Sequence, residues 1–173
     1  MAGLSAINAV GSSLVGHFRA VYPETLATTT PCDFRLVVGA EFDDLVEAPT
    51  TVSVLLYRVT ANEHLRSGLA PGAPGDARPP LSVNLHYLVT VWAAGAEAEQ
   101  LLAAWVLREL HARPLLDAPV LEPAGGFEPG DVVHLIPEEL TTEDLMRIWD
   151  ALTPAYRLSF CYVARVVRID LED

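Results

Sequence analysis

The residues best suited to catalysis or metal binding are scattered through the chain. They are five histidines and two cysteines: His17, His64, His86, His111, His134, Cys32 and Cys161. No histidine has a carboxylate or a second histidine at a metal-ligand spacing such as His-Glu-x-x-His, and the cysteines form no Cys-x-x-Cys pair. The sequence also has no Gly-x-Ser-x-Gly motif, no P-loop and no Gly-x-Gly-x-x-Gly turn after a strand. We therefore predict no catalytic, cofactor-binding or metal-binding residues, and a protein that is not an enzyme.

Two acidic segments, 41–47 and 170–173, are the other candidates for a cation site. A calcium loop needs acidic residues at alternate positions around a central glycine, and neither segment has this pattern. We interpret both segments as solvated surface. We interpret Cys32 and Cys161 as buried structural thiols, which are typical of a reducing compartment.

Acidic residues outnumber basic ones by 23 to 11, and every basic residue is an arginine, so the net charge is −12. Such a surface repels phosphate backbones, and we predict no nucleic-acid partner. No segment approaches the roughly 18 to 20 consecutive apolar residues that span a bilayer, so we expect no membrane span. The N-terminal segment lacks the basic start of a signal peptide and indicates a helix, which favours assembly in the cytoplasm.

Periodicity and breaker residues predict an alternation of helices and strands. The helices are expected at 4–20, 96–112 and 140–152, and the strands at 34–38, 51–59, 81–92, 118–123, 132–136 and 157–170. The order α-β-β-β-α-β-β-α-β excludes a simple doubly wound fold, because three strands follow one another without a helix. We expect one α+β domain over residues 1–173, with a mostly antiparallel or mixed sheet and flanking helices against one face. The loop at 66–80, with four prolines and three glycines, is predicted to be mobile.

The predicted strand at 81–92 is about twice as long as a typical strand. One side carries Leu81, Val83, Leu85, Tyr87, Val89 and Val91, and the other carries Ser82, Asn84, His86, Leu88, Thr90 and Trp92. We expect the apolar side to build the core and the lightly polar side to lie on the other face of the sheet, which is expected to be partly free. In the last strand the apolar residues change sides between Tyr162 and Val167, which predicts a bulge near Ala164.

Charged residues within strands are costly unless they face solvent, pair with acids or meet a partner. Four arginines lie in the predicted strands, and two polar residues accompany them: Arg58, Arg157, Arg165, Arg168, Asn84 and His86. A solvated face or internal ion pairs would explain them, and so would an interface between subunits. We take these six residues as candidates for an assembly interface.

Six segments, in this order, resemble one known family. They are LYRVTANEHLR (56–66), PPLSVNLHYLVT (79–90), EQLL (99–102), LLDAPVL (115–121), LTTEDLMRIWDAL (140–152) and YRLSFCYVARVVRID (156–170). Together they resemble the N-terminal domain of the cap, or tail-terminator, protein of extracellular contractile injection systems of the antifeeding-prophage type. The resemblance covers nearly the whole chain.

The resemblance implies a fold similar to phage tail terminators, with no catalytic site and no cofactor. It implies a homohexameric ring at the particle end distal from the baseplate, which ends the inner tube and holds the last sheath layer. Its partners would be further copies of the chain, the inner-tube protein and the sheath protein. Many members of the family continue into a C-terminal extension, and here the last strand or the segment 170–173 would substitute for it in any such sheath contact, by strand addition.

Two alternatives stay open on the sequence alone. The chain would act as a tail completion or adaptor protein elsewhere in such a particle, which differs from a cap only in location. Alternatively, it would be a stand-alone α+β enzyme or ligand-binding domain with an acidic, water-filled cleft around His86, Asn84 and Arg58. A pocket with converging polar groups would favour this last reading.

Overall fold

The computed structural model describes residues 2–62 and 81–169, so the loop predicted at 66–80 and the acidic segment 170–173 lie outside the described residues. The helices are α1 (Ala6–Val21), α2 (Glu24–Thr29), α3 (Phe42–Val46), α4 (Ala96–Ala112) and α5 (Thr142–Asp150). The strands are β1 (Asp33–Val37), β2 (Thr51–Ala61), β3 (Leu81–Trp92), β4 (Leu115–Leu116), β5 (Val133–Glu138) and β6 (Ser159–Ile169).

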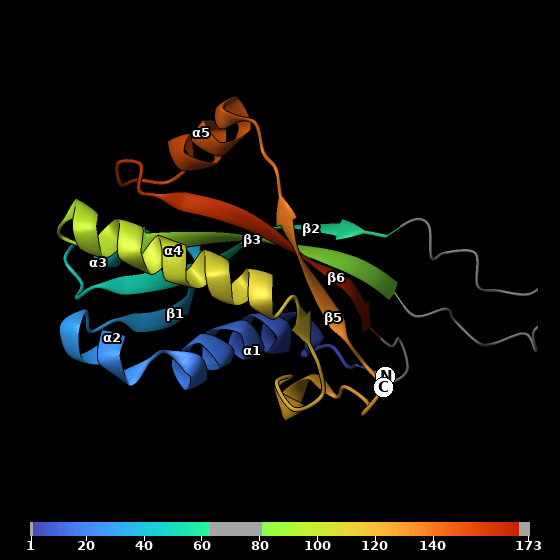
Figure 1. Ribbon diagram of the computed structural model, residues 1–173. Helices are drawn as coiled ribbons and strands as arrows, with labels where there is room; N and C mark the ends of the chain where they lie inside the picture. Colours follow the sequence, from blue (N-terminus) through green and yellow to red (C-terminus); the bar gives the residue numbers. More distant parts are fainter. Residues whose placement is uncertain (1, 63–80, 170–173) are drawn as a thin grey trace, which may run out of the picture.

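These strands form one sheet in the order β1-β2-β3-β6-β5-β4 (Figure 1). β1 pairs with β2 in parallel, and every other neighbouring pair is antiparallel. The parallel pair arises because the chain passes from β1 to β2 through a 3-10 turn (Gly39–Glu41) and α3, instead of through a tight hairpin. The predicted α+β class and the mixed sheet are therefore confirmed.

Helices α1 and α4 pack on the first face of the sheet (Figure 1). The apolar side of β3 is buried beneath them from Val83 to Val91, as its alternation predicts. α1 comes close to β1 at Gly11, where an added Cβ would lie 2.8 Å from Cδ1 of Leu36. The helix begins later than predicted, and Leu4 is consequently left exposed ahead of it.

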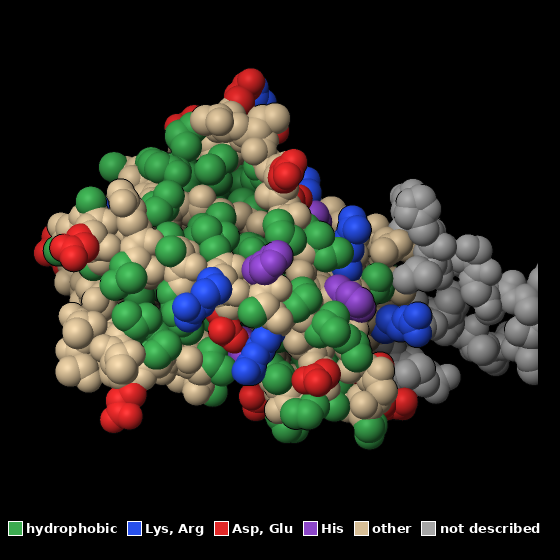
Figure 2. All heavy atoms as spheres, in the orientation of Figure 1, with side chains coloured by type: hydrophobic (Ala, Val, Ile, Leu, Met, Phe, Trp, Pro, Cys, Tyr) green, Lys and Arg blue, Asp and Glu red, His purple; other side chains and the backbone are tan. Residues whose placement is uncertain are grey.

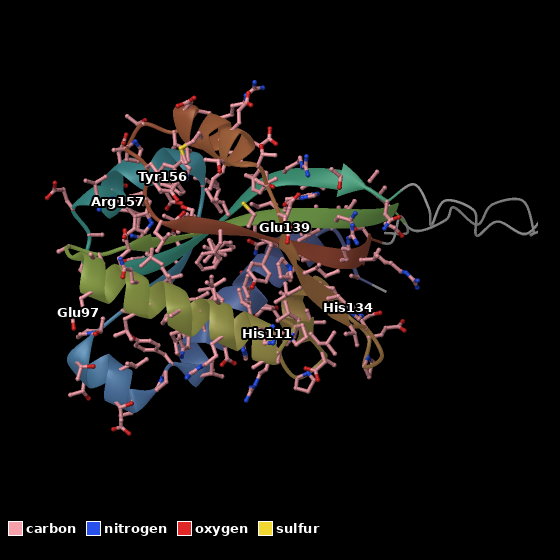
Figure 3. All side chains as sticks on the ribbon, turned by 45° about the horizontal axis from the view of Figure 1, so that its top comes forward. Glu97, His111, His134, Glu139, Tyr156 and Arg157 are labelled. Atoms are coloured by element: carbon pink, nitrogen blue, oxygen red, sulfur yellow. The ribbon has the colours of Figure 1, made fainter. Side chains whose placement is uncertain are left out.

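Helices also lie on the second face, which contradicts the prediction that the helices lie against one face. Phe42 and Leu45 of α3 and Trp149 of α5 are buried with Leu88 and Trp92 of β3 in a second hydrophobic cluster. Figure 3, in which the top of Figure 1 comes forward, shows both helices over one end of the sheet. The pattern hides α3 because this helix spans five residues of an acidic segment and buries only two of them.

The polar side of β3 is buried along most of its length. Ser82, His86 and Thr90 are 7%, 6% and 0% exposed, so this side of β3 is not accessible in the way that the predicted partly free face implied. The physical reason is that β3 lies between β2 and β6, and side chains of these neighbours close over it. The hydroxyl groups of Thr90 and Ser159, for example, lie 3.0 Å apart across the β3–β6 pair.

The C-terminal third agrees with the sequence in most details. α5 begins after Thr141, whose hydroxyl accepts a hydrogen bond from the backbone amide of Asp144 at 3.1 Å. The bulge expected near Ala164 is confirmed, because β6 has one extra residue between the pairs that Ala164 and Val167 make with β3. The strand expected at 118–123 is wrong, because this segment forms turns and the short β4 precedes it.

Candidate assembly surface

Beyond α3 and α5, the second face of the sheet ends in a group of basic side chains. Strand register places them together: Arg58 of β2 is paired with His86 of β3, and Arg165 of β6 is paired with His134 of β5. Arg168 lies farther along β6 and is paired with β3. Directly paired residues project from the same face of a sheet, so these side chains share one surface. We call Arg58, His134, Arg165 and Arg168 the arginine surface.

Glu138, the last residue of β5, accepts hydrogen bonds from β2 and β3. Its Oε2 accepts one from the Tyr57 hydroxyl at 2.6 Å, and its Oε1 accepts one from Arg58 Nη2 at 3.0 Å. Nδ1 of His86 lies 2.9 Å from the same Oε1, and Nε2 of His86 lies 3.0 Å from the Thr60 hydroxyl. The side chains of His86 and Glu138 are only 8% and 14% exposed. We call these five residues the Glu138 cluster, which ties β5 to β2 and β3 across β6.

Opposing effects act on the carboxyl group of Glu138. Burial raises its pKa, but the hydrogen bonds from Tyr57 and His86 and the nearby charges of His86 and Arg58 outweigh burial and hold the pKa below the ordinary value of 4.5. The pKa of Tyr57 is raised, first by burial and then by its hydrogen bond to Glu138. At neutral pH the cluster is therefore a carboxylate surrounded by donors.

The order of groups from Thr60 through His86 to Glu138, hydroxyl, imidazole and carboxylate, is that of a hydrolytic triad. A triad also needs donors beside the hydroxyl, where an oxyanion would develop. The cation within the cluster is Arg58, which binds the carboxylate of Glu138 at the end away from the Thr60 hydroxyl. Thr60 itself lies in the β2 ladder opposite Asn84, and its hydroxyl contacts only His86 within the described part of the chain. The arrangement suits the holding of strands better than attack on a substrate.

The remaining predicted interface residues are placed differently from one another. Arg157 lies at the opposite end of the second face, where its guanidinium carbon is 6.0 Å from the ring centre of Trp92 (Figure 3). Arg165 and Arg168 are exposed, and neither side chain has an ion pair or hydrogen bond within residues 2–62 and 81–169. Asn84 is half-buried, and its Oδ1 has no hydrogen-bond partner among the described residues. The structure thus joins Arg58 and His86 in one cluster.

Sequence reasoning missed Glu138, Tyr57 and Thr60 as partners of His86. Tyr57 and Arg58 are consecutive, yet both contact Glu138, because a bulge between Leu56 and Arg58 breaks the alternation of β2. Nothing in a single sequence connects Glu138 with His86, since 52 positions separate them.

The rest of the described structure offers little that indicates catalysis or metal binding. Within the described ranges, no set of three or more histidine, cysteine, aspartate or glutamate side chains is placed to hold a metal ion. None of the described helices has the length and apolar character needed to cross a bilayer. Cys161 is buried and Cys32 is half-buried, both as free thiols, and burial raises the pKa of each to about 12.

Comparison with known proteins identifies the fold. One similar structure is the sheath/tube terminator of the PVC extracellular contractile injection system in its extended state; it is 24% identical, with a TM-score of 0.64, over 96% of this chain and 57% of that chain. Another is the tube-terminating cap of the anti-feeding prophage, which is 22% identical, with a TM-score of 0.53, over 74% of this chain and 46% of that chain. No curated protein sequence matches the chain.

This chain therefore spans about half the length of these two solved chains. At these identities the likeness establishes the fold, and the expected similarity to tail terminators is confirmed at that level. A sequence family described as the Pvc16 N-terminal domain matches residues 16–173. Because this match covers nearly the whole chain, the chain belongs to the Pvc16 N-terminal domain family.

Proposed function

We propose that this chain ends the inner tube and the sheath of a contractile, phage-tail-like particle. The observation that carries the proposal is the fold that the chain shares, over 96% of its length, with a solved sheath/tube terminator. Membership of the Pvc16 N-terminal domain family and the likeness to a tube-terminating cap support it. The role is structural: the domain covers the last layer of subunits and leaves no surface for another layer.

In this proposal, copies of the chain form a homohexameric ring on the end of the tube. A closed ring needs a heterologous interface, in which one side of each copy fits the opposite side of its neighbour. Arg165 and Arg168 have no ion pair in the part of this acidic chain that the structure describes, and they support such an interface because they can meet acids of another molecule. The other partners are the inner-tube protein and the sheath protein, and assembly takes place in the cytoplasm.

An enzymatic role has weaker support. Among the described residues, the order of Thr60, His86 and Glu138 is the feature that favours it, and all three side chains are engaged in holding β2, β3 and β5 together. The function proposed here therefore assigns the Glu138 cluster to stability, and assigns no residue to catalysis.

Tube growth in vitro tests the proposal. Purified inner-tube protein is polymerised with and without this chain, and the tube lengths and the position of gold-labelled chain are measured by electron microscopy. Capping requires shorter tubes and label at one end only, whereas an acidic protein of similar size changes neither. Unchanged lengths, or label along the tube wall, would overturn the proposal. Label confined to the tube end that faces the baseplate in the particle would instead support the adaptor alternative.

A further inference from the structure

The arginine surface includes two cations, Arg165 and Arg168, for which the described residues supply no carboxylate partner, although the chain carries a net charge of −12. Arg165 and Arg168 are exposed and have no ion pair within the described residues. Arg168 lines a hollow of about 460 Å³ beside Asp131, but a carboxylate oxygen of Asp131 accepts a hydrogen bond from the Glu128 amide at 2.8 Å. Because acids are abundant, two arginines on one strand without an ion pair among residues 2–62 and 81–169 favour acidic partners from another molecule.

Acidic side chains stand at the opposite end of the same face. They lie on α3, directly after it at Glu47, and on α5, and all are exposed: Asp43, Asp44, Glu47, Glu143, Asp144 and Asp150. We call them the acidic wall. The two helices that carry the wall are held against the sheet by Phe42, Leu45 and Trp149, which are buried there. In Figure 2, arginine and histidine side chains lie beside β5 and β6, and acidic side chains lie over α5.

Only some of these carboxylates have cationic partners. Glu143 forms an ion pair with Arg147 one turn later in α5. Asp43, Asp44, Glu47 and Asp150 have no ion pair within the part of the chain that the structure describes. The wall therefore retains negative charge that a basic surface can neutralise.

Pairing of strands between copies is a poor alternative, because both outer edges of the sheet are obstructed. On β1, the outward amide of Phe34 donates to the Asp33 carboxylate at 2.8 Å, and Arg19 donates to the Phe34 carbonyl. Beyond the end of β1, Glu41 accepts from the amide of Val38 at 2.8 Å. On β5, the amide of Leu135 is taken by the carbonyl of Pro114 at 2.7 Å, and the next outward position, Pro137, has no amide hydrogen. Copies of the chain would therefore contact one another through side chains.

We propose that the arginine surface of one copy receives the acidic wall of the next copy. The two surfaces lie at opposite ends of one face, so the contact is head-to-tail and repeats around a closed ring. Each contact joins Arg165 and Arg168 to carboxylates of α3 and α5, and removes the repulsion that acidic copies would otherwise suffer. This inference rests on the proposed ring and names the surfaces that build it.

Charge reversal tests the pairing. The masses of the wild-type chain and of two double variants are measured by light scattering over a series of concentrations at low and high salt. R165E/R168E reverses the arginine surface. E47R/D150R reverses the wall at the C-terminal ends of α3 and α5, where a cation also suits the helix dipole. R108E, an exposed change on α4 of the first face, is the matched control.

We expect the wild type and R108E to associate at low salt and to dissociate as salt screens the contact. Each double variant alone should associate roughly a hundredfold more weakly, because like charges placed together oppose binding. An equimolar mixture of the two double variants should associate again, since each reversed surface then meets a complementary one. This recovery cannot come from misfolded chains.

Three results would overturn the pairing: a wild type that stays monomeric at low salt, double variants that associate like the wild type, or a mixture that does not recover. The tube assay separates this inference from the proposed function. A wild type that associates as expected but leaves tube length unchanged refutes the cap and leaves the pairing intact. A wild type that caps tubes while R165E/R168E retains full association refutes the pairing and leaves the cap intact.

Discussion

Replacement of Glu138 by Gln removes the charge from a buried acceptor while it preserves the shape of the side chain. A hydrogen bond to a charged group contributes about 1.5 to 3 kcal/mol, and one between neutral groups about 0.5 to 1.5 kcal/mol. The bonds from Tyr57 and His86 therefore each lose about 1 kcal/mol. The Arg58 side chain is 51% exposed, so the loss of its ion pair adds only about 0.5 kcal/mol. The total is about 2 to 3 kcal/mol, or roughly 4 to 12 °C in Tm for a chain of this size.

The effect should also depend on pH, with a defined sign. The folded pKa of Glu138 lies below the ordinary value of 4.5, so its stabilisation is complete above that value. It is lost as the pH falls through the folded pKa, because the wild-type side chain is then protonated too. The difference between wild type and E138Q should therefore be constant at neutral pH and shrink well below pH 4.5.

Urea unfolding followed by tryptophan fluorescence, at neutral and acidic pH, measures this difference. Glu139 is the matched control, because it is the next residue, is exposed (Figure 3) and carries the same charge. E139Q should change the free energy of unfolding by no more than about 0.5 kcal/mol. A loss for E138Q as small as that of E139Q, or a loss that is equal at both pH values, would refute the reasoning.

Further substitutions test the packing that supports the proposed surfaces. Trp149→Ala should cost about 3 to 5 kcal/mol, because the indole is 4% exposed beneath α5, and urea unfolding by circular dichroism measures the loss. Gly125→Ala should cost about 1 to 3 kcal/mol in the same assay, since its Cβ would lie 2.2 Å from Phe127, whereas Gly130→Ala has open space and should be neutral. The Cys161 thiol, with its pKa raised to about 12 by burial, should react with an aromatic disulfide reagent at mildly alkaline pH only after unfolding. Rapid reaction of the Cys161 thiol in the folded chain would show that β6 opens readily.

The sequence by itself determined the features that depend on local pattern. Alternation over 81–92, helical spacing over 96–112 and the Thr141 cap are read within one turn or one strand, and each element is present. The break in the alternation of the last strand likewise located the bulge near Ala164. The ordered motifs indicated the family, because they extend over nearly the whole chain, and the family match confirms it.

Only the tertiary structure decided what lies on the second face of the sheet. α3 and α5 reach it with few buried residues each, too few for periodicity to reveal which face they cover. The Glu138 cluster depends on β6 entering the sheet between β3 and β5, which brings Glu138 to His86 across 52 positions. The same insertion places Arg165 and Arg168 at one end of a face whose other end carries the carboxylates of α3 and α5. Local spacing cannot encode such neighbours, because the order of strands in a sheet is set by burial and pairing of the whole chain.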